Sequence, residues 1–176
     1  LEKGTSTLDQ RHRAVFTALV KPPRHNFGSG FANQIMNGWQ LSLITTAASA
    51  QYVSPSVLVS GAQYPGQPFN NTLNGFGGSN LVPFLSRQSI PVDSVFRTDS
   101  RLTKVFSAHE RYQFHLNFEV FNTFNNVSNT FVNTTAYQAR SGVLSPVNGL
   151  GVGTASAGFP DGTNARRAQV SLRVIF

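Results

Sequence analysis

The sequence offers few side chains that could carry catalysis or hold a metal ion, and their spacing does not suit either task. Cysteine is absent, and the four histidines are separated from one another along the chain. Metal sites built from nitrogen and sulfur ligands need such residues in closely spaced pairs. We therefore expect no metal and no other cofactor. The four histidines are His12, His25, His109 and His115.

Motifs for nucleophilic catalysis and for phosphate binding are incomplete. Serine, histidine and aspartate all occur, so counting alone leaves a catalytic triad open, but no Gly-x-Ser-x-Gly elbow is present to expose a serine. The glycine-rich segment 149–153 lacks the Gly-Lys-Ser/Thr ending of a phosphate-binding loop. Acidic residues are too few and too scattered for a calcium loop. We predict that the protein is not an enzyme.

Composition favours a turn-rich β protein with little charge. Charged residues make up 12% of the chain, which is about half the usual share in soluble domains. The net charge is +7, but the basic residues form no dense run, so the compact patch that nucleic-acid binding needs is missing. We expect no nucleic-acid partner. The 15 glycines and 9 prolines are spread along the chain, as in proteins with many turns.

The clearest predicted element is a β-strand over residues 111–121, where apolar and polar side chains alternate without a break. Alternation with period two places one set on each face of a strand, whereas a helix would spread both sets around its axis. The polar face carries His115, which we expect to form part of a water-facing wall rather than to act in catalysis. The apolar set is Tyr112, Phe114, Leu116, Phe118 and Val120, and the polar set is Gln113, His115, Asn117 and Glu119.

Four more segments alternate in the same way, with decreasing clarity: 165–176, 39–48, 96–106 and 11–20. The segment 39–48 begins at Trp39, and 96–106 ends at Phe106, so aromatic rings lie at strand ends. Lys104 is the one cation on an apolar strand face, and we expect its stem to reach the lipid headgroups from near the strand end. The last segment places Val170, Leu172, Val174 and Phe176 on one face.

The connections between these strands alternate between short and long. Links 106–111 and 20–39 are short or moderate, whereas 48–95 and 122–164 are long and rich in polar residues and glycine. Long loops without structure are uncommon in compact soluble domains, but membrane barrels carry them on the outer side only. If the final strand ends at the periplasm, both long connections fall on the outer side.

Strands of this length and patterning predict an all-β fold: antiparallel transmembrane β-barrel strands with long external loops. A barrel strand needs about 9–11 residues, with an apolar face toward lipid, a polar face toward the lumen and rings at the interfaces. We expect Trp39, Phe106, Tyr112, Phe114, Leu116 and Phe118 to face lipid or its interface, and Gln113, His115, Asn117 and Glu119 to face the lumen. A β-sandwich would bury the same rings in a dry core, so a secreted or surface β-rich structural protein or adhesin stays the alternative.

Five phrases of the sequence occur in an order that resembles the C-terminal region of Oar-like TonB-dependent receptors, which are large outer-membrane barrels. They cover nearly all of the chain outside the two long connections. The phrases are Gln10-Arg11-His12-Arg13-Ala14-Val15-Phe16, Gly38-Trp39-Gln40-Leu41-Ser42, Asp99-Ser100-Arg101-Leu102-Thr103-Lys104-Val105-Phe106, Glu119-Val120-Phe121-Asn122-Thr123-Phe124-Asn125-Asn126 and Arg166-Arg167-Ala168-Gln169-Val170-Ser171-Leu172-Arg173-Val174-Ile175-Phe176.

This resemblance implies a place in the bacterial cell outer membrane and a role in energised uptake of a large nutrient. The alternating end of the chain is similar to the signal read by the barrel-assembly machinery, here Val170, Leu172, Val174 and Phe176. The plug domain, the TonB box and most of the barrel of that family lie outside the sequence. Because five strands cannot close a barrel, residues 1–176 are expected to be the C-terminal part of one barrel. Its expected partners are membrane lipid, further strands of the same barrel or other chains, and a TonB-type energy transducer acting through the missing N-terminal part.

Overall fold

The computed structural model describes residues 4, 6, 8–60, 80–108, 112–154 and 156–176. The chain divides into two compact units, and each is described by itself. The first unit comprises residues 1–12, 48–95 and 128–163, and the second comprises 13–47, 96–127 and 164–176. The predicted tight link through His109 and Glu110 lies outside the described residues.

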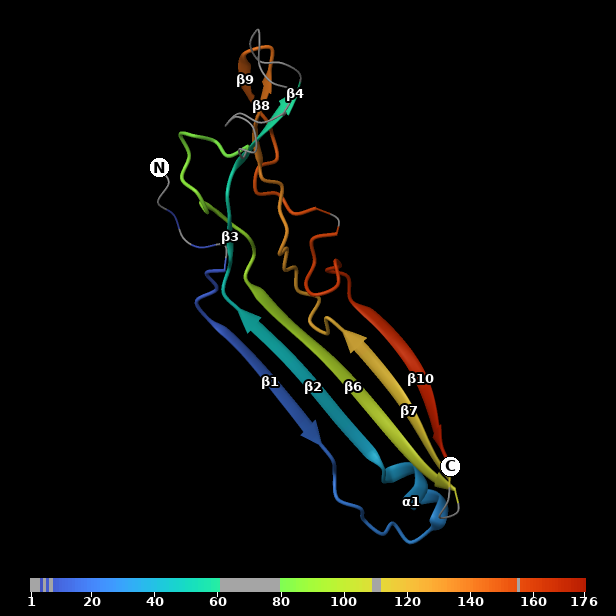
Figure 1. The fold of residues 1–176 in the computed structure, drawn as a ribbon. Coiled ribbons are helices and arrows are strands. Elements are labelled where there is room, and N and C mark those ends of the chain that lie inside the picture. Colours follow the sequence, from blue (N-terminus) through green and yellow to red (C-terminus); the bar gives the residue numbers. More distant parts are fainter. Residues whose placement is uncertain (1–3, 5, 7, 61–79, 109–111, 155) are drawn as a thin grey trace. The chain divides into compact units, whose positions relative to one another are not determined.

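The second unit is built on a five-stranded sheet in the order β1-β2-β6-β7-β10. The arrows of Figure 1 alternate in direction across it. The strand β7 pairs antiparallel with both β6 and β10. The strands are β1 (Arg13–Val20), β2 (Trp39–Ala48), β6 (Val95–Ala108), β7 (Tyr112–Phe121) and β10 (Arg167–Ile175).

Each of the five segments that alternate in the sequence contains one of these strands. The bounds of β2 coincide with those predicted, and β6 is longer than expected at both ends. The connections from β2 to β6 and from β7 to β10 are longer than the connection from β1 to β2, as predicted. The long ones leave from one end of the sheet, because the strands alternate in direction (Figure 1).

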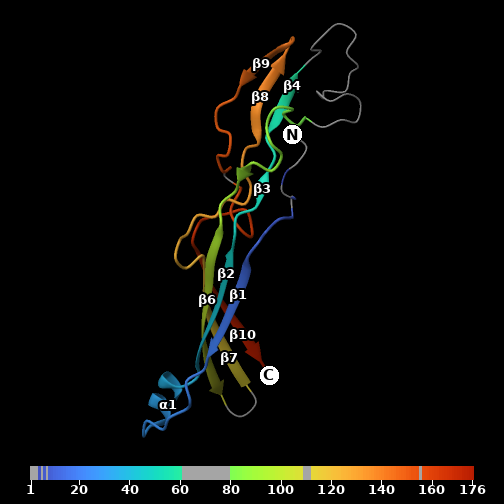
Figure 2. The ribbon, with the colours of Figure 1, turned by 90° about the vertical axis from the view of Figure 1, so that its left-hand side faces the viewer.

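The connection from β1 to β2 holds a short helix, α1 (Gly30–Met36), that the sequence reasoning did not anticipate. The helix begins after Ser29, whose side chain accepts a hydrogen bond from Ala32 N at 3.1 Å, as an N-cap residue does. It ends before Gly38, which has a φ of 80°. A Cβ at Gly38 would lie 2.5 Å from the carbonyl oxygen of Val105, so only glycine fits this tight return into β2. Figure 2 shows α1 standing on one side of the sheet.

The first unit gathers the long connections into small sheets, where long loops were predicted. A two-stranded antiparallel sheet joins β3 (Tyr52–Val53) and β5 (Ile90–Pro91). A three-stranded sheet has the order β4-β8-β9, with β4 parallel to β8 and β8 antiparallel to β9. Its strands are β4 (Ser56–Ser60), β8 (Thr135–Arg140) and β9 (Val143–Pro146).

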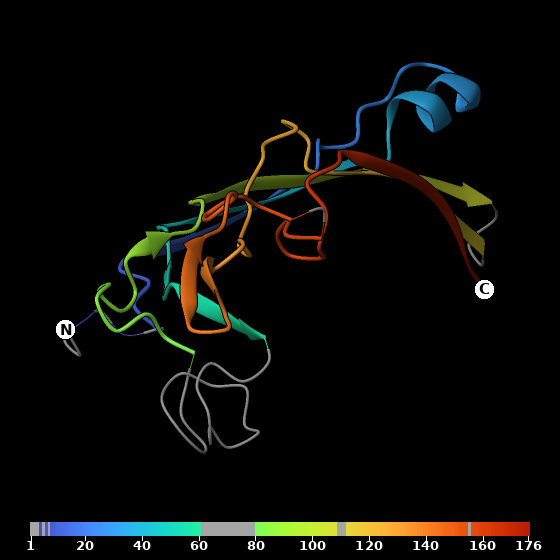
Figure 3. The same cartoon turned by 90° about the horizontal axis from the view of Figure 1, so that it is seen from above.

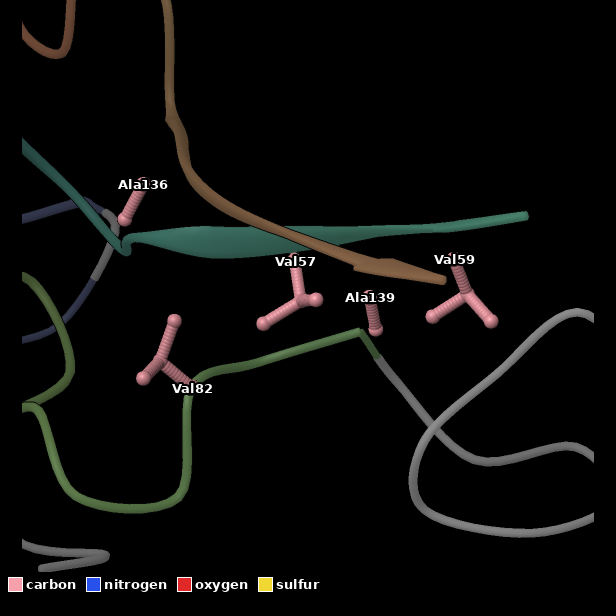
Figure 4. Close-up of a cluster of buried hydrophobic side chains, with 5 residues drawn as sticks. All are labelled: Val57, Val59, Val82, Ala136 and Ala139. Atoms are coloured by element: carbon pink, nitrogen blue, oxygen red, sulfur yellow. The ribbon is translucent and has the colours of Figure 1, made fainter. Parts of the chain in front are cut away.

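These small sheets have small apolar cores. One core gathers between β4, β8 and the segment around Val82, as Figure 4 shows. Another packs Ile90, Val92 and Val132 against Val53. Burial of these Val and Ala side chains stabilises the small sheets. Because the cores join segments that are far apart in the sequence, local sequence patterns do not predict them. The first core consists of Val57, Val59, Val82, Ala136 and Ala139.

Candidate functional site

One face of the five-stranded sheet carries rungs of hydrogen-bonded polar side chains. Thr103 Oγ1 donates to Asn117 Oδ1 at 2.8 Å, and Asn117 Nδ2 donates to Ser171 Oγ at 3.2 Å. These three residues are aligned across β6, β7 and β10 in the register of the sheet. The rung therefore ties three strands together through side chains as well as through the backbone.

The neighbouring rung is charged and is centred on Glu119. Arg101 Nε donates to Glu119 Oε1, and Gln169 Nε2 donates to Glu119 Oε2. Glu119 is only 7% exposed, and a carboxylate so far removed from water requires partners of this kind. Both oxygens are satisfied here, one of them by an opposite charge.

The four residues predicted to share the polar face of β7 do so in the structure. His115 Nε2 lies 3.3 Å from Gln113 Oε1, which completes a continuous polar strip along the strand. The sequence reasoning missed the partners on the adjacent strands, namely Arg101, Thr103, Gln169 and Ser171. Cross-strand pairs depend on register, and register becomes visible only when the strands are aligned.

The opposite face of the sheet is apolar. Each of three β7 side chains on this face lies between one side chain of β6 and one of β10. Phe118 is 47% exposed and Leu172 is 64% exposed, so no dry sandwich core forms over them. The sets are Leu102-Phe118-Val170, Lys104-Leu116-Leu172 and Phe106-Phe114-Val174.

An uncovered face of this kind on a water-soluble protein would be an aggregation surface, whereas hydrocarbon is a matching environment for it. The predicted assembly-signal residues Val170, Leu172 and Val174 lie on the same face as Phe118, and Phe176 is 87% exposed at the chain end. The predicted interface residues Trp39 and Tyr112 are 39% and 44% exposed.

Lys104 is held in a way that corrects our expectation. It is 4% exposed, so it does not extend toward headgroups. Its Nζ donates to the carbonyl oxygens of Gln34 at 2.7 Å, of Ile35 at 2.9 Å and of Asn37. Free carbonyls at a helix C-terminus attract cations, and here a strand residue supplies the cation. The ammonium group also lies 5.0 Å from the ring centre of Trp39 and 5.1 Å from that of Phe106.

The end of the sheet opposite α1 is closed by a buried asparagine. Asn122 is 2% exposed and has a φ of 54°. Its Nδ2 donates to the carbonyl oxygens of Asn126 at 2.9 Å and Asn164 at 2.6 Å, and its Oδ1 accepts from Asn126 N at 2.9 Å. Its backbone N donates to Asp99 Oδ1 at 2.8 Å. One side chain therefore joins the end of β7 to the segment that enters β10.

The described residues show no arrangement suited to metal binding. Nowhere in that part of the chain do three or more His, Cys, Asp or Glu residues come together. Within it, no helix is both long and apolar enough to cross a membrane. Segment 149–153 lies in a turn region, where Gly151 N donates to Asn133 O at 2.8 Å.

Comparison with known proteins gives one family. The family described as outer membrane beta barrel domain matches residues 1–169. No curated protein and no solved structure shows a significant match to the chain. The match confirms the predicted all-β fold and the location in the bacterial outer membrane, in agreement with a sheet that is polar on one face and apolar on the other. This chain belongs to the outer membrane beta barrel domain family.

Proposed function

We propose that this chain forms the last strands of a TonB-dependent outer-membrane receptor that takes up a large nutrient. The observation that carries the proposal is the contrast between the two faces of the five-stranded sheet. One face bears hydrogen-bonded rungs of amide, hydroxyl and charged groups, and the other bears exposed apolar side chains. A transport barrel needs this arrangement, with a watery lumen inside and lipid outside.

In this proposal the polar strip is part of the lumen wall and the apolar face contacts lipid. Gln113, His115, Asn117 and Glu119 face the lumen. Trp39 and Tyr112 lie at the membrane interface, with Phe106, Phe114, Leu116 and Phe118 along the lipid-facing surface. The alternating end of β10, from Val170 to Phe176, is the signal that the barrel-assembly machinery binds.

Further strands complete the barrel. Within the five-stranded sheet, β1 and β10 each have a neighbour on one side only. Unpaired backbone groups in hydrocarbon cost several kcal/mol each, so both edges need partners in the membrane. We infer that residues 1–176 are the C-terminal part of one larger barrel, and that strands of the same protein or of other chains cover the two edges.

The uptake role comes from the resemblance to Oar-like receptors. The substrate class is a siderophore, a peptide or a glycan, and energy comes from a TonB-type transducer that acts through the N-terminal part of the receptor. The alternative role, a secreted adhesin, would leave Phe118, Leu172 and their neighbours in water. The exposed apolar face therefore favours the barrel.

Uptake is tested in the native bacterium with the whole gene. A strain that lacks the gene and a complemented strain are compared for depletion of siderophores, peptides and glycans from the medium, with and without a protonophore. We expect the gene to be required for depletion of one of these classes, and the protonophore to abolish that depletion. Equal depletion of every class by both strains would contradict the transport proposal.

A further inference from the structure

We propose that the connection from β1 to β2, with α1 at its centre, is a binding site for an anionic phospholipid of the periplasmic leaflet. Three features of this segment carry the inference: a hollow on the apolar face of the sheet, exposed apolar side chains on and beside α1, and two exposed cations without acidic neighbours. Acyl chains suit the first two features, and a phosphate group suits the third.

The hollow lies between α1 and the sheet and has a volume of about 320 Å³. Ile35 borders it from α1, and Lys104 is the one charged residue in its lining. Because the three carbonyl oxygens at the end of α1 accept from the Lys104 ammonium, the hollow offers an apolar surface that suits an acyl chain. Its lining consists of Ile35, Trp39, Leu102, Lys104, Phe106, Leu116 and Phe118.

The outer surface of the helix is apolar as well. Phe31 is 78% exposed and Met36 is 56% exposed, and Phe27 just before the helix is 46% exposed. Segment 30–36 contains no charged residue. A short helix with rings on its free side lies naturally at the boundary between headgroups and acyl chains. In Figure 3 α1 lies on the convex side of the arch formed by β7 and β10, which is the outer side in a closed barrel.

Charge complementarity identifies the headgroup. Residues 21–38 include Lys21 and Arg24 but no Asp or Glu, and both cations are exposed. Among the described residues neither has a carboxylate partner within 4.0 Å. Cations at a membrane surface strengthen binding to anionic lipid by a factor of about five each. Arg24 lines a second hollow beside α1, together with Asn33 and Gln34 of the helix. In the proposed site, the acyl chain lies in the apolar hollow, and Lys21 and Arg24 favour a negatively charged headgroup over a zwitterionic one.

The test uses Trp39, which lines the hollow and is the only tryptophan of the chain. The whole receptor, with Phe in place of every tryptophan outside residues 1–176, is reconstituted into phosphatidylcholine vesicles that contain a small fraction of tail-brominated lipid, either phosphatidylglycerol or phosphatidylcholine. Bromine on a chain inside the hollow quenches Trp39 fluorescence. We expect the brominated phosphatidylglycerol to bind roughly five to twenty-five times more strongly than its zwitterionic counterpart, as two surface cations allow.

Two pairs of variants separate the parts of the site. Lys21→Gln with Arg24→Gln is expected to abolish the preference for phosphatidylglycerol, whereas Arg166→Gln with Arg167→Gln removes the same charge at the other end of the sheet and is expected to retain it. Leu116→Phe is expected to fill the hollow and reduce quenching by both lipids.

Its matched control is Leu172→Phe, which adds the same volume on the same sheet face outside the hollow and is expected to leave quenching unchanged. Equal quenching by the two lipids in the parent chain would overturn the proposal, as would a preference that survives loss of Lys21 and Arg24.

A second measurement applies to the protein as cells make it. Outer membranes are solubilised in mild detergent, and the lipid that copurifies with the protein is quantified by mass spectrometry. We expect phosphatidylglycerol to be enriched several-fold over the bulk membrane, with the enrichment lost in the variant that lacks Lys21 and Arg24. Copurified lipid that matches the bulk composition would refute the site while leaving the uptake proposal untouched, because no transport is measured.

Discussion

Replacing Asn122 by glycine isolates the contribution of its buried amide. Asn122 and Asn125 have nearly the same backbone conformation, with φ of 54° and 55°, and glycine adopts this region without strain. Asn125 is exposed, whereas Asn122 is 2% exposed and its side chain makes three hydrogen bonds. The same substitution at the two positions therefore differs mainly in what happens to that amide.

The expected magnitude follows from the three bonds. Each contributes roughly 1 kcal/mol, and loss of the amide leaves a partly buried N–H and two carbonyl oxygens without this partner, which adds to the cost. We expect Asn122→Gly to lower the free energy of unfolding by about 3–4 kcal/mol. Asn125→Gly is expected to change it by less than about 0.5 kcal/mol. Asn122→Ala adds about 1–2 kcal/mol to the cost, because alanine resists a positive φ.

Urea unfolding of the whole receptor, reconstituted into vesicles with Trp39 as its one tryptophan, measures these differences. Trp39 emission reports on β2, and heat-modifiable gel mobility reports on the barrel as a whole. The reasoning fails if the two glycine variants unfold at the same urea concentration. It also fails if Asn122→Ala is as stable as the parent, since that would mean that neither the amide nor the left-handed backbone is needed at the end of β7.

Three further predictions concern the sheet and its junction with α1. A membrane-impermeant maleimide that enters the lumen should label Asn117→Cys but not Leu116→Cys. Residues 1–176 contain no native cysteine, so labelling of both variants would contradict the assignment of faces. Lys104→Met should destabilise the contact between β6 and the end of α1 by about 2 kcal/mol. Tryptic cleavage after Arg24 should then be roughly thirtyfold faster, whereas Leu172→Met should leave the cleavage rate unchanged. Glu119→Gln should lower the free energy of unfolding by about 1–2 kcal/mol through loss of the charged contact with Arg101, and Gln113→Glu, at an exposed place on the same strip, should change it little in urea titrations.

The strands of the five-stranded sheet could be predicted because their signal is local. Side chains of a strand alternate between its two faces, so the faces of the strand from Tyr112 to Val120 can be assigned from those few residues alone. The polar strip of β7 was predicted for the same reason. Its partners Arg101 and Gln169 were not, because pairing across strands depends on register.

The features that escaped prediction depend on contacts between distant segments or on very short elements. The helix α1 has only 7 residues, too few for a helical period to stand out, although Ser29 is a recognisable N-cap. The parallel pairing of Val57 with Tyr137 joins segments 80 positions apart. Lys104 could be seen as a cation on an apolar face, but its acceptors come from residues about seventy positions earlier.

The bond between Lys104 and the end of α1 also couples the helix to the pairing of two strands. The donor lies on β6, and the acceptors are carbonyl oxygens of residues 34, 35 and 37, just before β2 begins. A shift of β6 along its neighbour would move the ammonium group away from these oxygens. The end of α1 and the register of β6 therefore stabilise each other.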